Sequence, residues 1–162
     1  MAHCDGTVRP VTNDDLEAPE MLDYGTLPKV LPTQATMIFD GHCGFCTRIV
    51  GWLGAIDRHD RLEFAAAQQP GVLERFELTG EEADDSAWTI GPDGERVGGA
   101  RAIALAVAVA IGNRAPYVPW HIPRGMWVMG KSYRFVANRR DKLPGTTPWC
   151  EQHPGQCRDP AA

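Results

Sequence analysis

The sequence predicts one mixed α/β domain, in which a strand-helix-strand unit is followed by a β-hairpin and further helices. Three observations indicate this class. The apolar run from Met37 to Phe39 ends in an Asp-Gly turn and an amphipathic segment follows it, and a second strand-like run covers Arg61 to Ala66. The residues from Gly91 to Gly94 separate two short strand-like segments, which is the strongest hairpin signal in the chain. With 162 residues, 43% of them hydrophobic, the chain can bury one core.

The first half of the predicted domain begins after an N-terminal arm. Residues 1–34 are rich in Asp, Glu and Pro without sustained periodicity, so we expect a flexible arm there. The strand Met37 to Phe39 follows, and then a helix from Gly44 to His59. The helix is indicated by apolar residues at helical spacing, namely Phe45, Ile49, Trp52, Leu53 and Ile56.

The second strand, Arg61 to Ala66, precedes a short helix from Pro70 to Leu78, since proline is tolerated at the first helical position. The acidic residues from Thr79 to Asp85 predict a polar loop. The hairpin strands are then Ser86 to Ile90 and Glu95 to Val97.

The last part of the domain is expected to be helical. Ala100 to Ile111 alternates with a period of two, but its alanine content and flanking glycines favour a buried helix. Ala115 to Pro123 is a proline-rich connector, in which Tyr117 and Trp120 are expected to cover the core. Helical spacing of Met126, Met129, Tyr133 and Val136 predicts a helix from Arg124 to Arg140. The predicted domain therefore spans residues 35–140, and residues 141–162 form an irregular tail.

Charge and hydropathy exclude several classes of function. The net charge is -5, and the basic excess after residue 113 comes with no nucleic-acid motif, so it indicates a solvated helix face and no nucleic-acid partner. The longest weakly polar run, Ala102 to Ile111, is too short to span a membrane, and the N-terminus lacks a basic start followed by an apolar block. We therefore expect a soluble cytoplasmic protein without a membrane partner.

The most informative residues are two cysteines at the start of the first predicted helix. Cys43 and Cys46 are three residues apart and hence on one helix face, where a disulfide is within reach. Amide groups in the first turn have no intrahelical partner and the helix dipole is positive there, so we expect the pKa of the Cys43 thiol to fall. Of the five cysteines, Cys4 lies in a polar segment. Cys150 and Cys157 could form a tail disulfide, an accessory redox pair or two unpaired thiols.

The predicted order of elements resembles the minimal thioredoxin-like, glutaredoxin-like fold, with an added C-terminal helix and irregular arms at both ends. The string Asp40-Gly41-His42-Cys43-Gly44-Phe45-Cys46 resembles the signature of the DCC family of thiol-disulfide oxidoreductases. Tyr133-Arg134-Phe135-Val136-Ala137-Asn138-Arg139 is similar to the recurrent Tyr and Asn-Arg pattern of that family. The resemblance covers about Thr36 to Arg140.

The resemblance implies an enzyme that exchanges disulfides with a protein or a low-molecular-weight thiol or disulfide, without a cofactor. Cys43 would attack the substrate disulfide and Cys46 would resolve the mixed disulfide. Asp40 would accept a proton for Cys46 or cap the helix. A second group of residues is assigned to substrate binding or to tuning the thiol pKa, namely His42, Gly44, Phe45 and Arg139.

The residues are also compatible with two other functions. Zinc or an iron-sulfur cluster could be bound by Cys43 and Cys46, together with Cys150 and Cys157 or with His42 and His153. The domain could also be a non-catalytic interaction module. Thioredoxins carry a cis-proline before the third strand, whereas Asp85-Ser86-Ala87 stands there in this chain. Substrate docking by backbone pairing at that point is therefore not expected.

Overall fold

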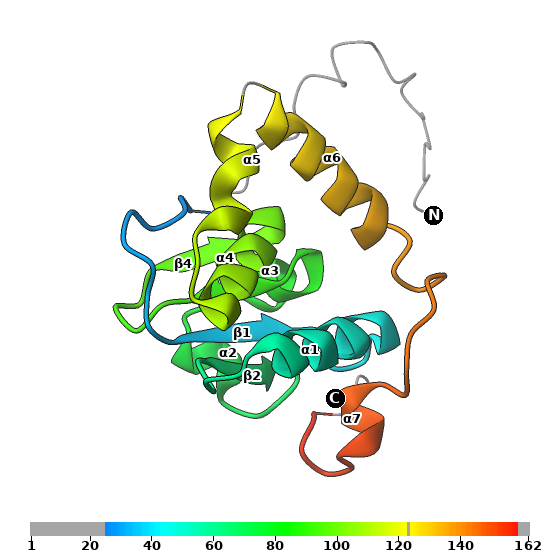
Figure 1. The fold of residues 1–162 in the computed structure, drawn as a ribbon. Helices are drawn as coiled ribbons and strands as arrows, with labels where there is room; N and C mark the ends of the chain where they lie inside the picture. Colours follow the sequence, from blue (N-terminus) through cyan, green and yellow to red (C-terminus); the bar gives the residue numbers. More distant parts are fainter. Residues whose placement is uncertain (1–24, 123, 159–162) are drawn as a thin grey trace, which may run out of the picture.

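A computed structural model describes residues 25–122 and 124–158 of the chain (Figure 1). Its centre is a four-stranded sheet with the order β2-β1-β3-β4. Strand β1 (Ala35–Phe39) is parallel to β2 (Leu62–Ala66) and antiparallel to β3 (Trp88–Ile90), which pairs antiparallel with β4 (Arg96–Gly98). This confirms the predicted strand-helix-strand unit and hairpin, and it is consistent with a thioredoxin-like fold.

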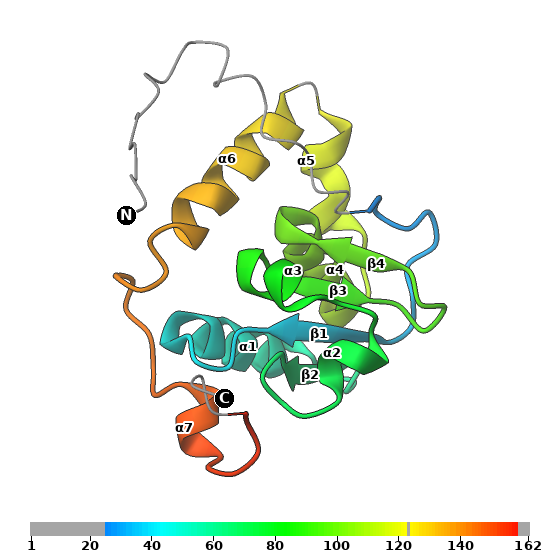
Figure 2. The ribbon, with the colours of Figure 1, turned by 180° about the vertical axis from the view of Figure 1, so that it is seen from behind.

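Helices cover both faces of the sheet (Figures 1 and 2). Helix α1 (Gly44–Ile56) connects the parallel strands, and with α4 (Gly99–Ile111) it packs on the face that carries Met37. The short helices α2 (Val72–Arg75) and α3 (Gly80–Asp85) pack on the opposite face around Ile38 and Trp88. Buried strand side chains alternate between the two cores because successive residues of a strand point to opposite faces.

The C-terminal part of the chain leaves the sheet and returns to it. A short 3-10 helix, η2 (Ala115–Tyr117), and α5 (Val118–His121) lead into α6 (Gly125–Ala137), which stands off from the sheet (Figure 2). An extended stretch then brings the chain back to α7 (Trp149–Gln152), near the start of α1 (Figure 1). Apart from α7, described residues 141–158 contain no helix or strand.

Three expectations about local structure were wrong. The predicted loop from Thr79 to Asp85 contains α3, because Thr79 and Glu82 form a capping box: the Thr79 hydroxyl accepts from the Glu82 amide at 3.1 Å, and the Glu82 carboxylate accepts from the Thr79 amide at 2.8 Å. The helix predicted from Pro70 to Leu78 is much shorter, since only Val72–Arg75 is helical. On α1, Leu53 is buried, but Trp52 and Ile56 are 57% and 43% exposed, so the apolar stripe is narrower than predicted.

The described part of the N-terminal arm, residues 25–34, has no helix or strand. Leu27 and Leu31 nevertheless pack against the core cluster that contains Val97 and Tyr117, and Arg101 donates to the carbonyl of Gly25 at 2.8 Å. Residues 1–24, including Cys4, lie outside the described residues. In the described ranges, no helix has the length and apolar character needed to span a membrane.

Candidate functional site

The turn between β1 and α1 presents the two cysteines. The carboxylate of Asp40 accepts from the His42 amide at 3.0 Å, and the Cys43 amide donates to the Asp40 carbonyl at 3.2 Å. An Asp side chain that bonds the backbone two residues ahead is typical of a tight turn. Gly41 is required here because a Cβ atom would lie 2.7 Å from the sulfur of Cys150 and 2.8 Å from Cβ of Ala66.

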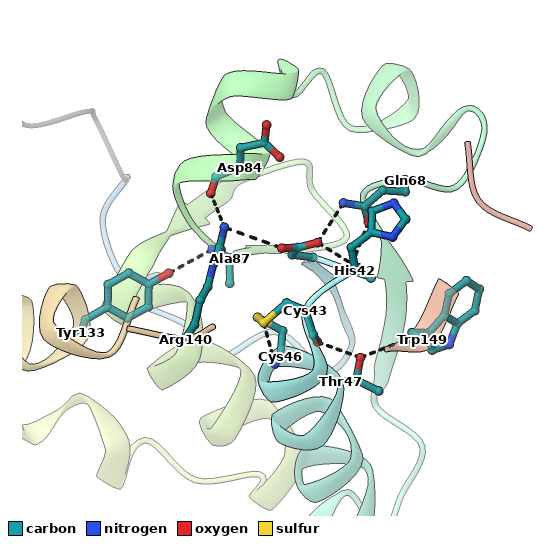
Figure 3. The surroundings of a disulfide bond; sticks show 12 residues. His42, Cys43, Cys46, Thr47, Gln68, Asp84, Ala87, Tyr133, Arg140 and Trp149 are labelled. Atoms are coloured by element: carbon teal, nitrogen blue, oxygen red, sulfur yellow. Dashed lines mark hydrogen bonds and ion pairs between the residues drawn. A yellow bond between two sulfur atoms is a disulfide. The ribbon is translucent and has the colours of Figure 1, made fainter. Parts of the chain in front are cut away.

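Cys43 is the N-cap residue of α1. Its backbone is extended, and its sulfur accepts a hydrogen bond from the Cys46 amide at 3.1 Å (Figure 3). The sulfur therefore occupies the place that a Ser or Asn oxygen usually takes at a helix N-terminus. An amide donor and the positive end of the dipole both favour the thiolate over the thiol. Cys43 and Cys46 form a disulfide with a Cα–Cα distance of 5.2 Å.

The two cysteines face different surroundings. Cys43 lines an open cavity of about 530 Å³, whose other walls include His42, Gly44 and Thr146. Cys46 instead lines a smaller cavity of about 80 Å³ between α1 and α6, with mainly apolar walls. Three residues line both cavities, namely Asp40, Phe45 on α1, and Arg140.

Asp40 is held by several groups around this site. Its Oδ1 accepts from the side-chain amide of Gln68 at 3.0 Å, and the Oε1 of Gln68 accepts from the Gly41 amide at 2.8 Å. Its Oδ2 lies 3.6 Å from Nη2 of Arg140, which also donates to the carbonyl of Asp84 at 3.1 Å (Figure 3). Gln68 thus fixes both the backbone and the carboxylate of the turn.

The backbone before β3 is occupied by other parts of the chain. The Ala87 amide donates to the hydroxyl of Tyr133 on α6 at 3.0 Å (Figure 3). The Ala87 carbonyl accepts from the Gly99 amide at 2.9 Å. Burial raises the pKa of Tyr133 above its ordinary value, so this hydroxyl stays protonated. The described residues contain no cis peptide bond. Neither backbone group of Ala87 is therefore available for pairing with a substrate strand.

The structure gathers most of the residues singled out in the sequence. Asp40, His42, Cys43, Gly44 and Phe45 line the open cavity, and Cys46 lies one helical turn further along α1.

Arg139 lies elsewhere, since its exposed guanidinium is placed over the ring of Phe135 at 4.1 Å. The cation at the site is Arg140, the next residue along the chain. Gln68 carries no sequence signal, because its role depends on β2 lying beside β1. Tyr133 lies in the family-like pattern, but its contact with Ala87 is visible only in the fold.

The other two cysteines also form a disulfide, Cys150–Cys157, with a Cα–Cα distance of 5.7 Å. His153 stacks on Trp149 with ring centroids 4.1 Å apart. Within residues 25–122 and 124–158, no three His, Cys, Asp or Glu side chains are grouped so that they could hold a metal ion. The two ligand sets that the sequence left open are thus not assembled in this part of the chain.

Comparison with known proteins agrees with this geometry. The family model described as DCC1-like thiol-disulfide oxidoreductase matches residues 37–146, which is more than half of the chain. No curated protein and no solved structure matches the chain. The matched region contains the strand that leads into the site, the Cys-x-x-Cys pair and both Tyr133 and Arg140. The fold, the paired cysteines and this match together show that the chain belongs to the DCC1-like thiol-disulfide oxidoreductase family.

Proposed function

We propose that this protein exchanges disulfides, with Cys43 as the nucleophile and Cys46 as the resolving thiol. The observation that carries the assignment is the difference between the surroundings of the two cysteines. Cys43 lies at the open cavity and on the helix N-terminus, whereas Cys46 lines the smaller apolar cavity. A nucleophile needs access to substrate and a stabilised thiolate, while a resolving thiol needs to reach only its partner. The family match supports the same class of reaction.

The exchange proceeds in two displacements. The Cys43 thiolate attacks one sulfur of the substrate disulfide, so a mixed disulfide forms and the other half of the substrate leaves as a thiolate. The Cys46 thiolate then attacks the sulfur of Cys43. The Cys43–Cys46 disulfide forms, and the second substrate thiolate leaves. Two electrons pass to the substrate, and a thiol reductant returns the protein to the dithiol state.

The surrounding residues have distinct roles in this proposal. The Cys46 amide, 3.1 Å from the sulfur of Cys43, stabilises Cys43 both as a thiolate and as a leaving group. Asp40 lines the same cavity as Cys46 and accepts its proton. Oδ1 of Asp40 accepts from Gln68 and from the His42 amide, whereas Oδ2 faces Arg140 at 3.6 Å, so Oδ2 is the oxygen that takes the proton in this proposal.

The open cavity indicates the class of substrate. Its volume of about 530 Å³ and its polar walls suit a disulfide of a low-molecular-weight thiol or of a protein segment. His42, Gly44 and Phe45 line this cavity and contact the substrate in the proposal. Arg140 takes the charge-supplying role that the sequence had suggested for Arg139, because Arg140 lines both cavities.

Trapping the mixed disulfide tests the assignment. The Cys46→Ser variant, reduced and then exposed to oxidised glutathione, should accumulate one glutathione on Cys43, as measured by intact mass and peptide mapping. The Cys43→Ser variant should form no stable adduct at Cys46. The Cys4→Ser variant is the control, and like the unaltered chain it should accumulate no glutathione adduct on Cys43, because Cys46 resolves it. Adduct formation at Cys46 rather than Cys43, or none at either residue, would refute the assigned roles.

A further inference from the structure

The second disulfide lies outside the region that the family model covers. Cys150 and Cys157 are seven residues apart, and the family match ends at residue 146. Cys150 is buried at 8% exposure, whereas Cys157 is half-buried. The function proposed above gives this pair no role, although α7 lies near the start of α1 (Figure 1).

The C-terminal segment binds the start of α1. The Thr146 amide donates to the Gly44 carbonyl at 3.0 Å. The Trp149 amide donates to the Thr47 hydroxyl at 3.0 Å, and that hydroxyl donates to the Cys43 carbonyl at 3.0 Å (Figure 3). The backbone on both sides of the Cys43 sulfur is therefore connected to residues 146–149.

The disulfide itself is connected to the turn that precedes Cys43. The Cys150 amide donates to the Gly41 carbonyl at 3.0 Å, and the Cys150 sulfur packs where a Cβ atom of Gly41 would be. Beyond Cys157, the Arg158 amide donates to the Gln68 carbonyl at 2.9 Å, and the Gln68 side chain holds both Asp40 and Gly41. The two ends of the disulfide thus reach the same turn by two routes.

We propose that Cys150–Cys157 is a second thiol-disulfide exchange site, which accepts electrons from low-molecular-weight thiols or dithiols and sets the redox equilibrium of Cys43–Cys46. This inference rests on the function proposed above. A reductant thiolate attacks the more exposed sulfur, that of Cys157. The sulfur–sulfur bond breaks, and Cys150 leaves as a thiolate that takes up a proton. A second reductant thiol displaces Cys157 from the mixed disulfide, so the pair gains two electrons and two protons and the reductant becomes a disulfide.

The direction of the coupling follows from the contacts. Once the bond is broken, Arg158 is no longer tied to Cys150 through Cys157, and only its exposed ion pair with Glu74, at 2.8 Å, still holds it. Exposed ion pairs contribute little, so the contact of the Arg158 amide with the Gln68 carbonyl weakens. Gln68 then holds Asp40 and Gly41 less firmly, and the turn before Cys43 becomes less ordered. A less ordered helix N-terminus stabilises the Cys43 thiolate less. The dithiol form of the first pair loses stability, and its equilibrium shifts toward the disulfide.

The redox equilibrium of the first pair is the quantity to measure. The full chain and its Cys150→Ser/Cys157→Ser variant are equilibrated in glutathione buffers of graded potential, quenched with acid and alkylated, and the Cys43–Cys46 disulfide is quantified by mass spectrometry. The variant should shift the equilibrium constant toward the disulfide by about fivefold or more, the lower end of typical couplings between sites. Cys4→Ser is the control and should show no shift. A smaller shift, or one toward the dithiol, overturns the proposal.

Two further measurements test the proposal even if the double variant does not fold correctly. In the unaltered chain, Cys150–Cys157 should stay oxidised near the midpoint of Cys43–Cys46 and become reduced at the more reducing end of the same buffer series, and a pair that stays oxidised throughout overturns the proposal. Gln68→Ala breaks the same connection with the disulfide intact, so it should reproduce the shift. Adding Gln68→Ala to the double variant should not change the Cys43–Cys46 equilibrium constant further, because both changes act through the same contacts. Additive shifts overturn the proposed path.

These results are separable from the proposed function. If Cys46→Ser traps no adduct at Cys43 while the equilibrium shift is present, the assigned catalytic roles fail and the coupling stands. If the adduct forms and the shift is missing, the coupling fails and the catalytic roles stand.

Discussion

The N-cap geometry of Cys43 leads to a stability prediction that needs no substrate. Cys43→Ser and Cys43→Ala both remove the proposed nucleophile and the disulfide, so these losses cancel when the two variants are compared. They differ in the group that accepts from the Cys46 amide, which lies 3.1 Å from the sulfur in the structure. Serine is among the best N-cap residues and alanine is among the poor ones. The serine variant should therefore be the more stable of the two.

The size of the difference follows from the cap alone. Replacing a capping Ser by Ala costs about 1 kcal/mol, with a range of roughly 0.5–2 kcal/mol. That corresponds to about a fivefold change in the unfolding equilibrium constant and to roughly 2–4 °C in melting temperature for a chain of this size. A large effect of the cap is expected because residue 43 has the extended backbone of an N-cap, with φ -92° and ψ 111°.

Urea unfolding under reducing conditions, followed by circular dichroism, measures the two free energies, and equal m-values would show that the denatured states are comparable. Cys46→Ser and Cys46→Ala form the matched control. Cys46 is inside the helix and faces the smaller apolar cavity, so alanine should be the better residue there and the order should reverse. An alanine variant at position 43 that equals or exceeds the serine variant would refute the capping role of Cys43.

Four other substitutions test features elsewhere in the fold. In urea unfolding, Gly44→Ala should destabilise the protein by about 1–3 kcal/mol, because a Cβ atom would clash with the Thr146 carbonyl. Gly51→Ala should instead stabilise the protein by about 0.5–1 kcal/mol, because a Cβ atom at Gly51 would have no neighbour within 4 Å. Equal effects would contradict the close contact at Gly44. Tyr133→Phe leaves the amide before β3 without its partner and should cost about 1–3 kcal/mol in the same assay, and an unchanged midpoint would argue against that hydrogen bond. Burial raises the pKa of Tyr117 from 10.0 to about 12, so its contribution to stability is fully present below pH 10.0 and is lost as the pH rises toward 12. Tyr117→Phe should reduce this alkaline loss in denaturant titrations at graded pH, and an unaltered pH profile would exclude Tyr117 as its cause.

Local patterns predicted most of the fold because the corresponding forces are local. The apolar run before Asp40, the helical spacing after Cys43 and the Gly-Pro-Asp-Gly turn each specify an element through neighbouring residues. The predicted loop after Thr79 is wrong for a local reason. The acidic residues after Thr79 indicated a loop, although the Thr79–Glu82 pair is a helix-capping motif that the sequence already contains.

The candidate site likewise has one part that the sequence predicts and one part that only the packing of the elements decides. The Cys-x-x-Cys spacing at a helix start is enough to place two sulfurs within bonding distance, since residues three apart share a helix face. The sequence predicted Arg139 as the cation of the site, but Arg140 lies there. Adjacent residues point in different directions, and only the packing of α6 and the residues after it decides which of the two lies at the site.

The sequence by itself determined a Cys-x-x-Cys pair at the first turn of a helix in an α/β domain, because capping, periodicity and turn formation act over a few residues. The tertiary structure decided which sulfur faces the open cavity, which cation lies beside Asp40 and what covers the backbone before β3. It also brought the Cys150–Cys157 disulfide against Gly41, over a hundred residues away in the chain. Such contacts depend on how elements pack in space, and no spacing along the chain encodes them.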